Sequence, residues 1–260
     1  MIDTHCHLTF PALSQRLHEV IADAKAHGVD RYIIIGTTLD DGDALQMIAE
    51  HHDEVWFTIG LHPHDAQRWA DRSQDLEQVL SRFAGHPRCV AIGEMGLDLH
   101  YNDPPLDVQI KAFAAQLDWI KATACEKPIV IHNRKATDQT LSVLKASGLP
   151  GDRFVFHCFT GSPDEVDAIL DFGATVGFTG VVTFKNAADV REAFDRVPLD
   201  RLLIETDSPY LTPEPYRQVR PNEPRYVAEV AKFLAKRRQL SLKAFVAQVD
   251  ANAERLFGLT

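Results

Sequence analysis

Histidine and carboxylate side chains at the ends of apolar segments are the residues of this sequence best suited to chemistry. His5 and His7 lie two residues apart at the end of the short segment 1–7. In an extended strand, residues i and i+2 point to the same side, so both imidazoles can converge on one point as metal ligands do. Two nearby histidines are also compatible with ordinary packing, since the chain contains twelve. The other candidate ligands must decide between these interpretations.

Further donors follow later apolar segments in the same way, namely Glu94, His132, His157 and Asp207. One histidine at the end of a strand is readily explained as a packed core or rim residue. Six nitrogen and oxygen donors gathered at one edge of the fold are much harder to explain as packing residues. Buried carboxylates are also costly in free energy unless they are paired or bound to a metal. The sequence therefore predicts a metal site with six ligands: His5, His7, Glu94, His132, His157 and Asp207.

The elements that must position these donors alternate along the chain. Short β-branched or aromatic segments predict eight strands, at 1–7, 29–36, 55–60, 89–94, 128–132, 153–157, 174–178 and 201–205. Glu94 is expected to end the fourth. This alternation with helices predicts a (β/α)8 TIM barrel, an α/β fold, formed by one domain of residues 1–260. An open doubly wound sheet is the alternative, but no glycine-rich phosphate-binding loop supports it.

Apolar residues at helical spacing mark the helices between the strands. We expect helices at 13–24, 41–51, 76–83, 106–124, 137–145, 163–172, 188–196, 226–237 and 242–257. The segment Ser162-Pro163-Asp164-Glu165 has the form of a capping box with proline at the first helical position. Gly148 and Gly173 are expected to end the helices that precede them.

Composition places the chain among ordinary globular proteins. It is 45% hydrophobic and 25% charged, and no apolar run approaches the roughly 18 residues of a membrane span.

The amino terminus lacks a signal peptide, and four scattered cysteines without a C-x-x-C pair indicate reduced thiols, so we expect a cytoplasmic protein. A net charge of −10 argues against a broad nucleic-acid-binding surface but permits a small basic patch. We expect a monomer that does not bind membranes.

The number of donors predicts two metal ions. Four imidazoles and two carboxylates exceed what one tetrahedral ion needs, whereas two ions that share a bridging carboxylate would use all six. Paired ions about 3.5–4 Å apart can displace an oxygen from a phosphate ester or open an amide. The predicted enzyme is a hydrolase whose nucleophile is an activated water beside a carboxylate. Mg, Mn and Zn are all compatible with this mixed donor set.

Seven ordered segments resemble the TatD family of metal-dependent deoxyribonucleases, within the amidohydrolase-like barrel superfamily. They are IDTHCH at 2–7, GLHP at 60–63, GEMGLD at 93–98, KPIVIHNR at 127–134, HCFTG at 157–161, ETDSPY at 205–210 and RPNEP at 220–224. The similarity runs from end to end. Many relatives in the wider superfamily carry a carbamylated lysine where this chain has Glu94, and this difference favours phosphoester chemistry over amide and lactone hydrolysis.

The resemblance also implies roles for single residues. His5, His7 and Asp207 would hold the first ion, Glu94 would bridge, and His132 with His157 would hold the second. Glu205 would lie near the metals and could position water. His62 would contact a phosphate or protonate a leaving group. With Glu94 and Asp207, these two residues complete the expected catalytic set.

DNA is the substrate that the resemblance implies, and cations on the carboxyl-end face would contact it. Arg134 and Arg220 lie in matching segments and are the favoured contacts, whereas a solvated rim explains Lys185 and Arg217 equally well. Asp98 and Tyr101 could line the cleft.

We therefore predict cleavage of DNA phosphodiesters from an end. One alternative keeps the site but acts on another ester or amide, such as D-aminoacyl-tRNA or a small molecule. Another is a non-catalytic metal-binding barrel that serves as an interaction module, although a structural site would close with four ligands.

Overall fold

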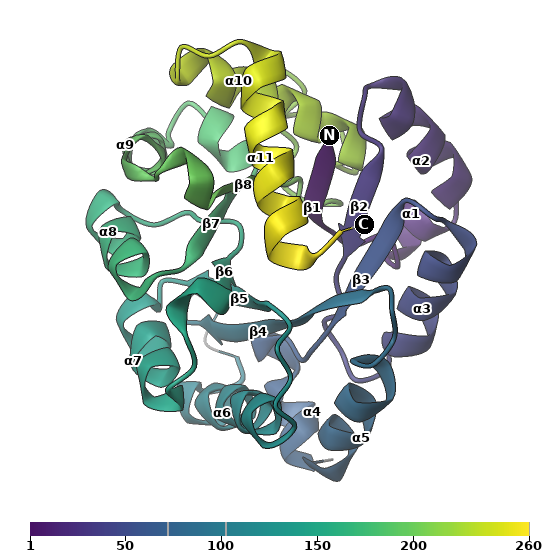
Figure 1. The fold of residues 1–260 in the computed structure, drawn as a ribbon, viewed down its shortest axis with the longest axis vertical. Helices are drawn as coiled ribbons and strands as arrows, with labels where there is room; N and C mark the ends of the chain where they lie inside the picture. Colours follow the sequence, from purple (N-terminus) through teal and green to yellow (C-terminus); the bar gives the residue numbers. More distant parts are fainter. Residues whose placement is uncertain (72, 102, 260) are drawn as a thin grey trace.

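Eight parallel strands form one sheet in the order β1 to β8 among the residues that the computed structural model describes, which are 1–71, 73–101 and 103–259 (Figure 1). The strands are β1 Ile2–Cys6, β2 Arg31–Ile34, β3 Val55–Ile59, β4 Cys89–Asp98, β5 Ile129–Arg134, β6 Phe154–Phe156, β7 Thr175–Phe178 and β8 Leu202–Ile204. The segment after β8 returns to β1, where the amide of Asp207 donates to the carbonyl of His5 at 2.9 Å. The predicted (β/α)8 barrel is confirmed.

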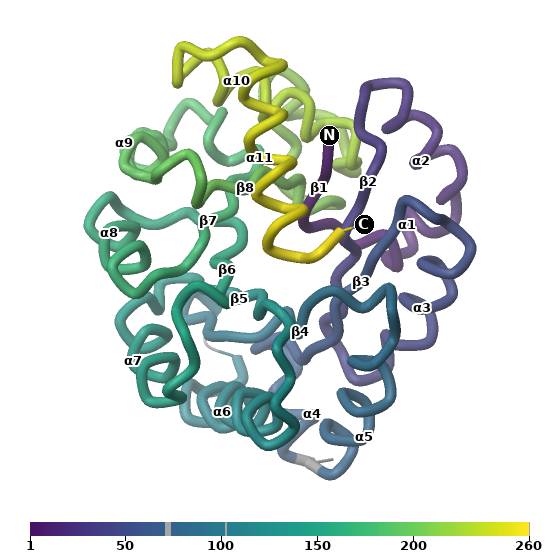
Figure 2. Tube along the Cα trace, in the orientation of Figure 1, coloured from purple at the N-terminus to yellow at the C-terminus, as the bar shows by residue number. Residues whose placement is uncertain are grey.

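The helices surround this barrel (Figures 1 and 2). They are α1 Pro11–Ser14, α2 Leu17–Ala26, α3 Gly42–His51, α4 Ala66–Asp71, α5 Ser73–Phe83, α6 Leu106–Ala122, α7 Thr137–Ser147, α8 Pro163–Phe172, α9 Ala188–Arg196, α10 Val227–Arg237 and α11 Leu242–Phe257. No helix within the described ranges is both long enough and apolar enough to cross a membrane.

Helix α11 closes the amino-terminal end of the barrel. Asn252 donates to the carbonyl of Leu202 at the start of β8, and Asp250 accepts from the amide of Ile2 at the start of β1. Phe257 packs with Ile33 and other side chains of the barrel interior. The carboxyl ends of the strands lie at the opposite side, where barrel enzymes build their active sites.

Local sequence signals placed several helix ends correctly. Ser162 and Glu165 form the predicted capping box at the start of α8, while Gly148 and Gly173 end α7 and α8 with left-handed φ values of 71° and 105°. The predicted helix 13–24 is instead two helices. The break falls at Arg16, whose backbone leaves the helical region and whose guanidinium pairs with the buried carboxylate of Glu223. Helix α4 was not predicted.

The expectation that Glu94 ends the fourth strand is wrong, because β4 continues to Asp98. Its register against β5 shifts around Glu94, and Gly93 there has φ +137°. A Cβ on Gly93 would lie 2.6 Å from the carbonyl oxygen of Val130, so only glycine permits this close approach. The shift turns Glu94 toward the barrel mouth without ending the strand.

Candidate metal centre

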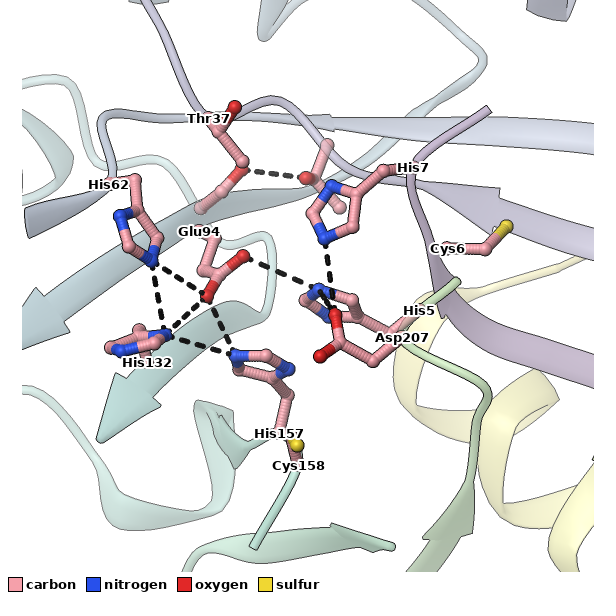
Figure 3. A network of polar contacts seen from close by, with 12 residues as sticks. His5, Cys6, His7, Thr37, His62, Glu94, His132, His157, Cys158 and Asp207 are labelled. Carbon is pink, nitrogen blue, oxygen red and sulfur yellow. Dashed lines mark hydrogen bonds and ion pairs between the residues drawn. The ribbon is translucent and has the colours of Figure 1, made fainter. Parts of the chain in front are cut away.

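All six predicted ligands meet in one cluster at the carboxyl ends of the strands (Figure 3). They come from five strands or the residues just after them, namely His5 and His7 from β1, Glu94 from β4, His132 from β5, His157 from β6 and Asp207 from β8. His5 is fully buried, and Glu94 is 2% exposed. Ionisable groups at this depth require compensating charges or metal ions.

The first part of the cluster joins the two ends of the chain. Nε2 of His7 lies 3.2 Å from Oδ1 of Asp207, and Nε2 of His5 lies 3.7 Å from the same oxygen. The ligand atoms of these three residues lie within 4.8 Å of one another. Burial would raise the pKa of Asp207, but its hydrogen bond with His7 and the nearby His5 hold that pKa below the usual value. Asp207 is therefore an anion beside two imidazoles.

The second part of the cluster surrounds Oε1 of Glu94. Nδ1 of His132 and Nε2 of His157 each lie 2.7 Å from this oxygen and 3.4 Å from one another. His62, expected to contact phosphate, also belongs to this group: its Nε2 lies 3.5 Å from the same oxygen and 3.2 Å from Nδ1 of His132. His62, Glu94 and His132 together could hold a metal ion.

Glu94 connects the two parts, because its other oxygen, Oε2, lies 3.3 Å from Nε2 of His5. Burial would raise the pKa of Glu94, but His157 and His62 beside it and the hydrogen bond with His132 hold the pKa well below its usual range. Glu94 is consequently a buried carboxylate whose oxygens face separate sets of nitrogens.

Unpaired imidazole nitrogens show that this cluster fits metal ions. Both ring nitrogens of His5, Nδ1 of His7 and Nδ1 of His157 are buried and make no hydrogen bond with any described residue. Burial and the neighbouring His157 lower the pKa of His5 to about 4, so its ring is in the neutral form that binds metals. A divalent cation would satisfy the Nε2 of His5 and balance the buried carboxylates.

Glu205 lies on the far side of His157 from Glu94. Its Oε1 accepts from the backbone amide of Cys158 and lies 3.8 Å from Nδ1 of His157, whereas Nε2 of that ring faces Glu94. Oε2 of Glu205 accepts from the hydroxyl of Thr4 at 3.2 Å. Burial raises the pKa of Glu205 to about 7. Glu205 is thus held by Thr4 and Cys158 beside His157, and its expected contact with water stays a prediction.

Asp98 has a role that sequence analysis missed. Its buried Oδ2 lies 3.2 Å from Nε2 of His132 and 3.0 Å from Nε2 of His64, while Oδ1 accepts the amides of His100 and Tyr101. A carboxylate on one ring nitrogen of a ligand histidine fixes its tautomer and leaves the other nitrogen for the metal. Side chains alternate along a strand, so Glu94 and Asp98, four residues apart, point to the same side if the strand continues past Glu94. This spacing was the signal that the sequence offered for Asp98.

The two arginines expected to contact the substrate, unlike His62, lie outside the cluster. Arg134 ends β5, and its guanidinium lies 5.0 Å from the ring centroid of Tyr101. Arg220 is exposed, with Nη1 bonded to the carbonyls of Arg217 and Val219 in its own loop. Cys6, between two ligands, is buried and points away from the cluster (Figure 3). It packs in the hydrophobic core, because side chains alternate along the strand.

A parallel eight-stranded barrel with buried histidine and carboxylate ligands at its carboxyl-end face defines a metal-dependent hydrolase. The family model described as TatD related DNase matches residues 2–258, and the chain belongs to this TatD family. It is 38% identical over 265 residues to the 3′-5′ ssDNA/RNA exonuclease TatD of Klebsiella pneumoniae, covering 100% of this chain and 98% of that protein. It is 37% identical over 257 residues to an uncharacterized metal-dependent hydrolase, YabD, of Bacillus subtilis, covering 99% and 98%.

Solved structures share the architecture. The crystal structure of YjjV, a TatD homologue from Escherichia coli, matches with a TM-score of 0.91 and 30% identity, covering 99% of this chain and 98% of that one. A phosphotriesterase homology protein from Escherichia coli, solved with phosphate in its active site, matches with a TM-score of 0.68 and 19% identity over 98% of both chains. The second likeness concerns the fold alone.

Proposed function

We propose that the protein is a nuclease that uses two divalent ions to remove nucleotides from an end of single-stranded DNA. The observation that carries this proposal is the position of Glu94, whose Oε1 lies 2.7 Å from ligand nitrogens of two histidines and whose Oε2 lies 3.3 Å from a third. A bridging carboxylate between two ligand sets is what a two-ion hydrolase needs. His5, His7 and Asp207 would hold one ion, and His132 with His157 the other.

Ions at these positions would activate the attacking water and offset the negative charge that develops on the phosphate oxygens. The chain's own residues supply the remaining steps. Asp207, kept ionised by His7 and His5, is the carboxylate that would orient or deprotonate the water. This assigns to Asp207 the role of general base.

His62 is suited to donate a hydrogen bond to the substrate. Its Nδ1 accepts the amide N–H of His64 at 3.1 Å, so the neutral ring carries its proton on Nε2. Burial and the neighbouring His132 lower the pKa of His62 well below its usual value, which keeps the ring neutral. Nε2 faces the cluster, where it would donate to a phosphate oxygen or to the leaving oxygen.

The relatives support the substrate class and the direction of digestion. The relative from Klebsiella pneumoniae carries the name 3′-5′ ssDNA/RNA exonuclease, and a glutamate bridge favours phosphoester chemistry. A net charge of −10 provides little general attraction for a duplex, whereas a site that binds one end needs few phosphate contacts. We therefore infer digestion of a single strand from its 3′ end.

The test uses metal-free protein supplied with Mg²⁺, Mn²⁺ or Zn²⁺ and oligonucleotides labelled at either end. We expect metal-dependent release of mononucleotides from the 3′ end, reduced by at least roughly 100-fold in His132→Ala. The matched control is His51→Ala, because His51 is an exposed histidine on α3 whose Nδ1 bonds only to its own helix. Absence of metal-stimulated cleavage, with His132→Ala equal to wild type, would refute the proposal. Faster hydrolysis of D-aminoacyl-tRNA or of a small ester would assign the site to that substrate instead.

A further inference from the structure

Exposed tyrosines gather at the face of the barrel that carries the metal centre. Among the described residues, the tyrosines with large exposed fractions are Tyr101 at 60%, Tyr210 at 51% and Tyr216 at 43%. Tyr101 follows β4, and the other two follow β8, so all three lie in loops at the carboxyl ends of strands. Aromatic rings left in water at the mouth of a site are commonly binding surfaces.

Tyr101 borders the part of the cluster that contains His132. Its backbone amide is held by Asp98, which also contacts Nε2 of His132. Its ring meets the edge of His64 at 5.4 Å between centroids, and the guanidinium of Arg134 lies 5.0 Å from the ring centroid. The guanidinium thus lies over one face of the Tyr101 ring, and a base could stack only on the other face of this ring, which is 60% exposed as a residue.

Tyr210 borders the part of the cluster that contains His7 and Asp207. It follows Asp207 by three residues, and its ring meets Phe10 and His7 edge-on, with centroids 6.0 and 6.5 Å apart. Because β4 and β8 are four strands apart in an eight-stranded barrel, the two tyrosines approach the mouth from opposite sides.

We propose that Tyr101 and Tyr210 are stacking platforms for unpaired nucleobases on either side of the scissile phosphodiester. This inference rests on the proposed nuclease function and names the residues that recognise the substrate. Every base offers a π-face, so such platforms bind single strands with little sequence preference. In a duplex, a base inside the helix has both faces covered by its neighbours, and only the terminal base has one free face. Two successive bases can therefore stack on two tyrosines only when the strand is unpaired. Arg134 adds a cation for a phosphate next to the base that stacks on Tyr101.

The test compares two five-residue oligonucleotides that differ only in their bases. One is oligothymidylate, and the other has stable tetrahydrofuran residues in place of the last two nucleosides at its 3′ end. Each is given to wild type, Tyr101→Ala, Tyr210→Ala, and the Phe variants at both positions. Tyr216→Ala is the matched control, because Tyr216 is also exposed at this face but packs on Tyr226, with ring centroids 5.1 Å apart. Fluorescence anisotropy of metal-free protein gives Kd, and metal-loaded protein gives kcat and KM.

Each Ala variant should raise Kd and KM for oligothymidylate by roughly 10-fold, the effect expected of one lost base–aromatic stack. Neither Ala variant should change Kd or KM for the oligonucleotide that lacks its last two bases. The Phe variants and Tyr216→Ala should match wild type with both oligonucleotides. If the Ala variants changed Kd and KM equally for both oligonucleotides, or for neither, the proposal that these tyrosines stack on bases would be refuted. If metal-loaded wild type cleaved neither oligonucleotide, the nuclease proposal would fail by itself, and the binding constants would still decide whether the tyrosines recognise bases.

Discussion

Replacement of Asp98 by asparagine is expected to weaken metal binding although Asp98 itself is not a ligand. Oδ1 of Asp98 accepts the amides of His100 and Tyr101 at 2.8 and 3.1 Å, so the oxygen of an asparagine must stay on that side. The asparagine NH2 group would then face Nε2 of His132, where the carboxylate oxygen lies 3.2 Å away. A donor at this position favours the tautomer with its proton on Nδ1, the nitrogen that lies 2.7 Å from Glu94 and would bind the ion.

Loss of such a supporting partner typically costs 10–100-fold in metal affinity. This corresponds to about 1.4–2.8 kcal/mol of binding free energy. Calorimetric titration of metal-free protein with Mn²⁺ or Zn²⁺ measures it directly. The control is Asp195→Asn, which removes an exposed carboxylate at the end of α9 that pairs with Arg237 and should leave the affinity unchanged. An Asp98→Asn protein that melts like wild type and binds the metal equally well would refute this account of His132.

Other consequences concern stability. Gly177→Ala should lower the free energy of unfolding by about 1–3 kcal/mol in urea titrations, because the new Cβ would lie 2.7 Å from Oε2 of Glu205; unchanged stability would show that Glu205 moves freely. Glu165→Gln should cost about 1 kcal/mol at pH 7, because the hydrogen bonds that the Glu165 carboxylate accepts in the capping box of α8 would go to a neutral amide oxygen. Burial would raise the pKa of Glu165, but hydrogen bonds from Thr137 and Ser162 lower it below 4.5. Its contribution is therefore present above pH 4.5 and lost as the pH falls through the lowered pKa, so thermal melts of the two proteins should converge in acid. Free metal at 100 times its Kd should raise the free energy of unfolding by about 2.7 kcal/mol, a gain that EDTA removes.

Features governed by neighbouring residues could be predicted from the sequence. The capping box of Ser162 and Glu165 and the glycine ends of α7 and α8 depend on contacts within a few residues, and the structure has them where they were expected. The alternation of strands and helices likewise predicted the barrel. His5 and His7 lie on one side of β1 because side chains alternate along any strand, which also turns Cys6 away.

Features that depend on a partner strand could not be predicted in the same way. The course of β4 beyond Glu94 follows from the close approach of Gly93 to the backbone of Val130, which lies on β5. The helix break at Arg16 coincides with an ion pair between Arg16 and Glu223, which lies more than two hundred residues away in the sequence.

The residue types of the candidate metal centre were determined by the sequence, whereas its geometry was decided by the tertiary structure. Donor types and their positions next to apolar segments are local properties of the chain. Which atom faces which neighbour depends on barrel closure and side-chain direction. Closure places His5 of β1 beside Glu94 of β4, and the pairing of β4 with β5 places Asp98 beside His132. Glu205, just after β8, lies 3.8 Å from Nδ1 of His157, just after β6. Each of these contacts joins different strands, so no pattern within one segment could reveal them.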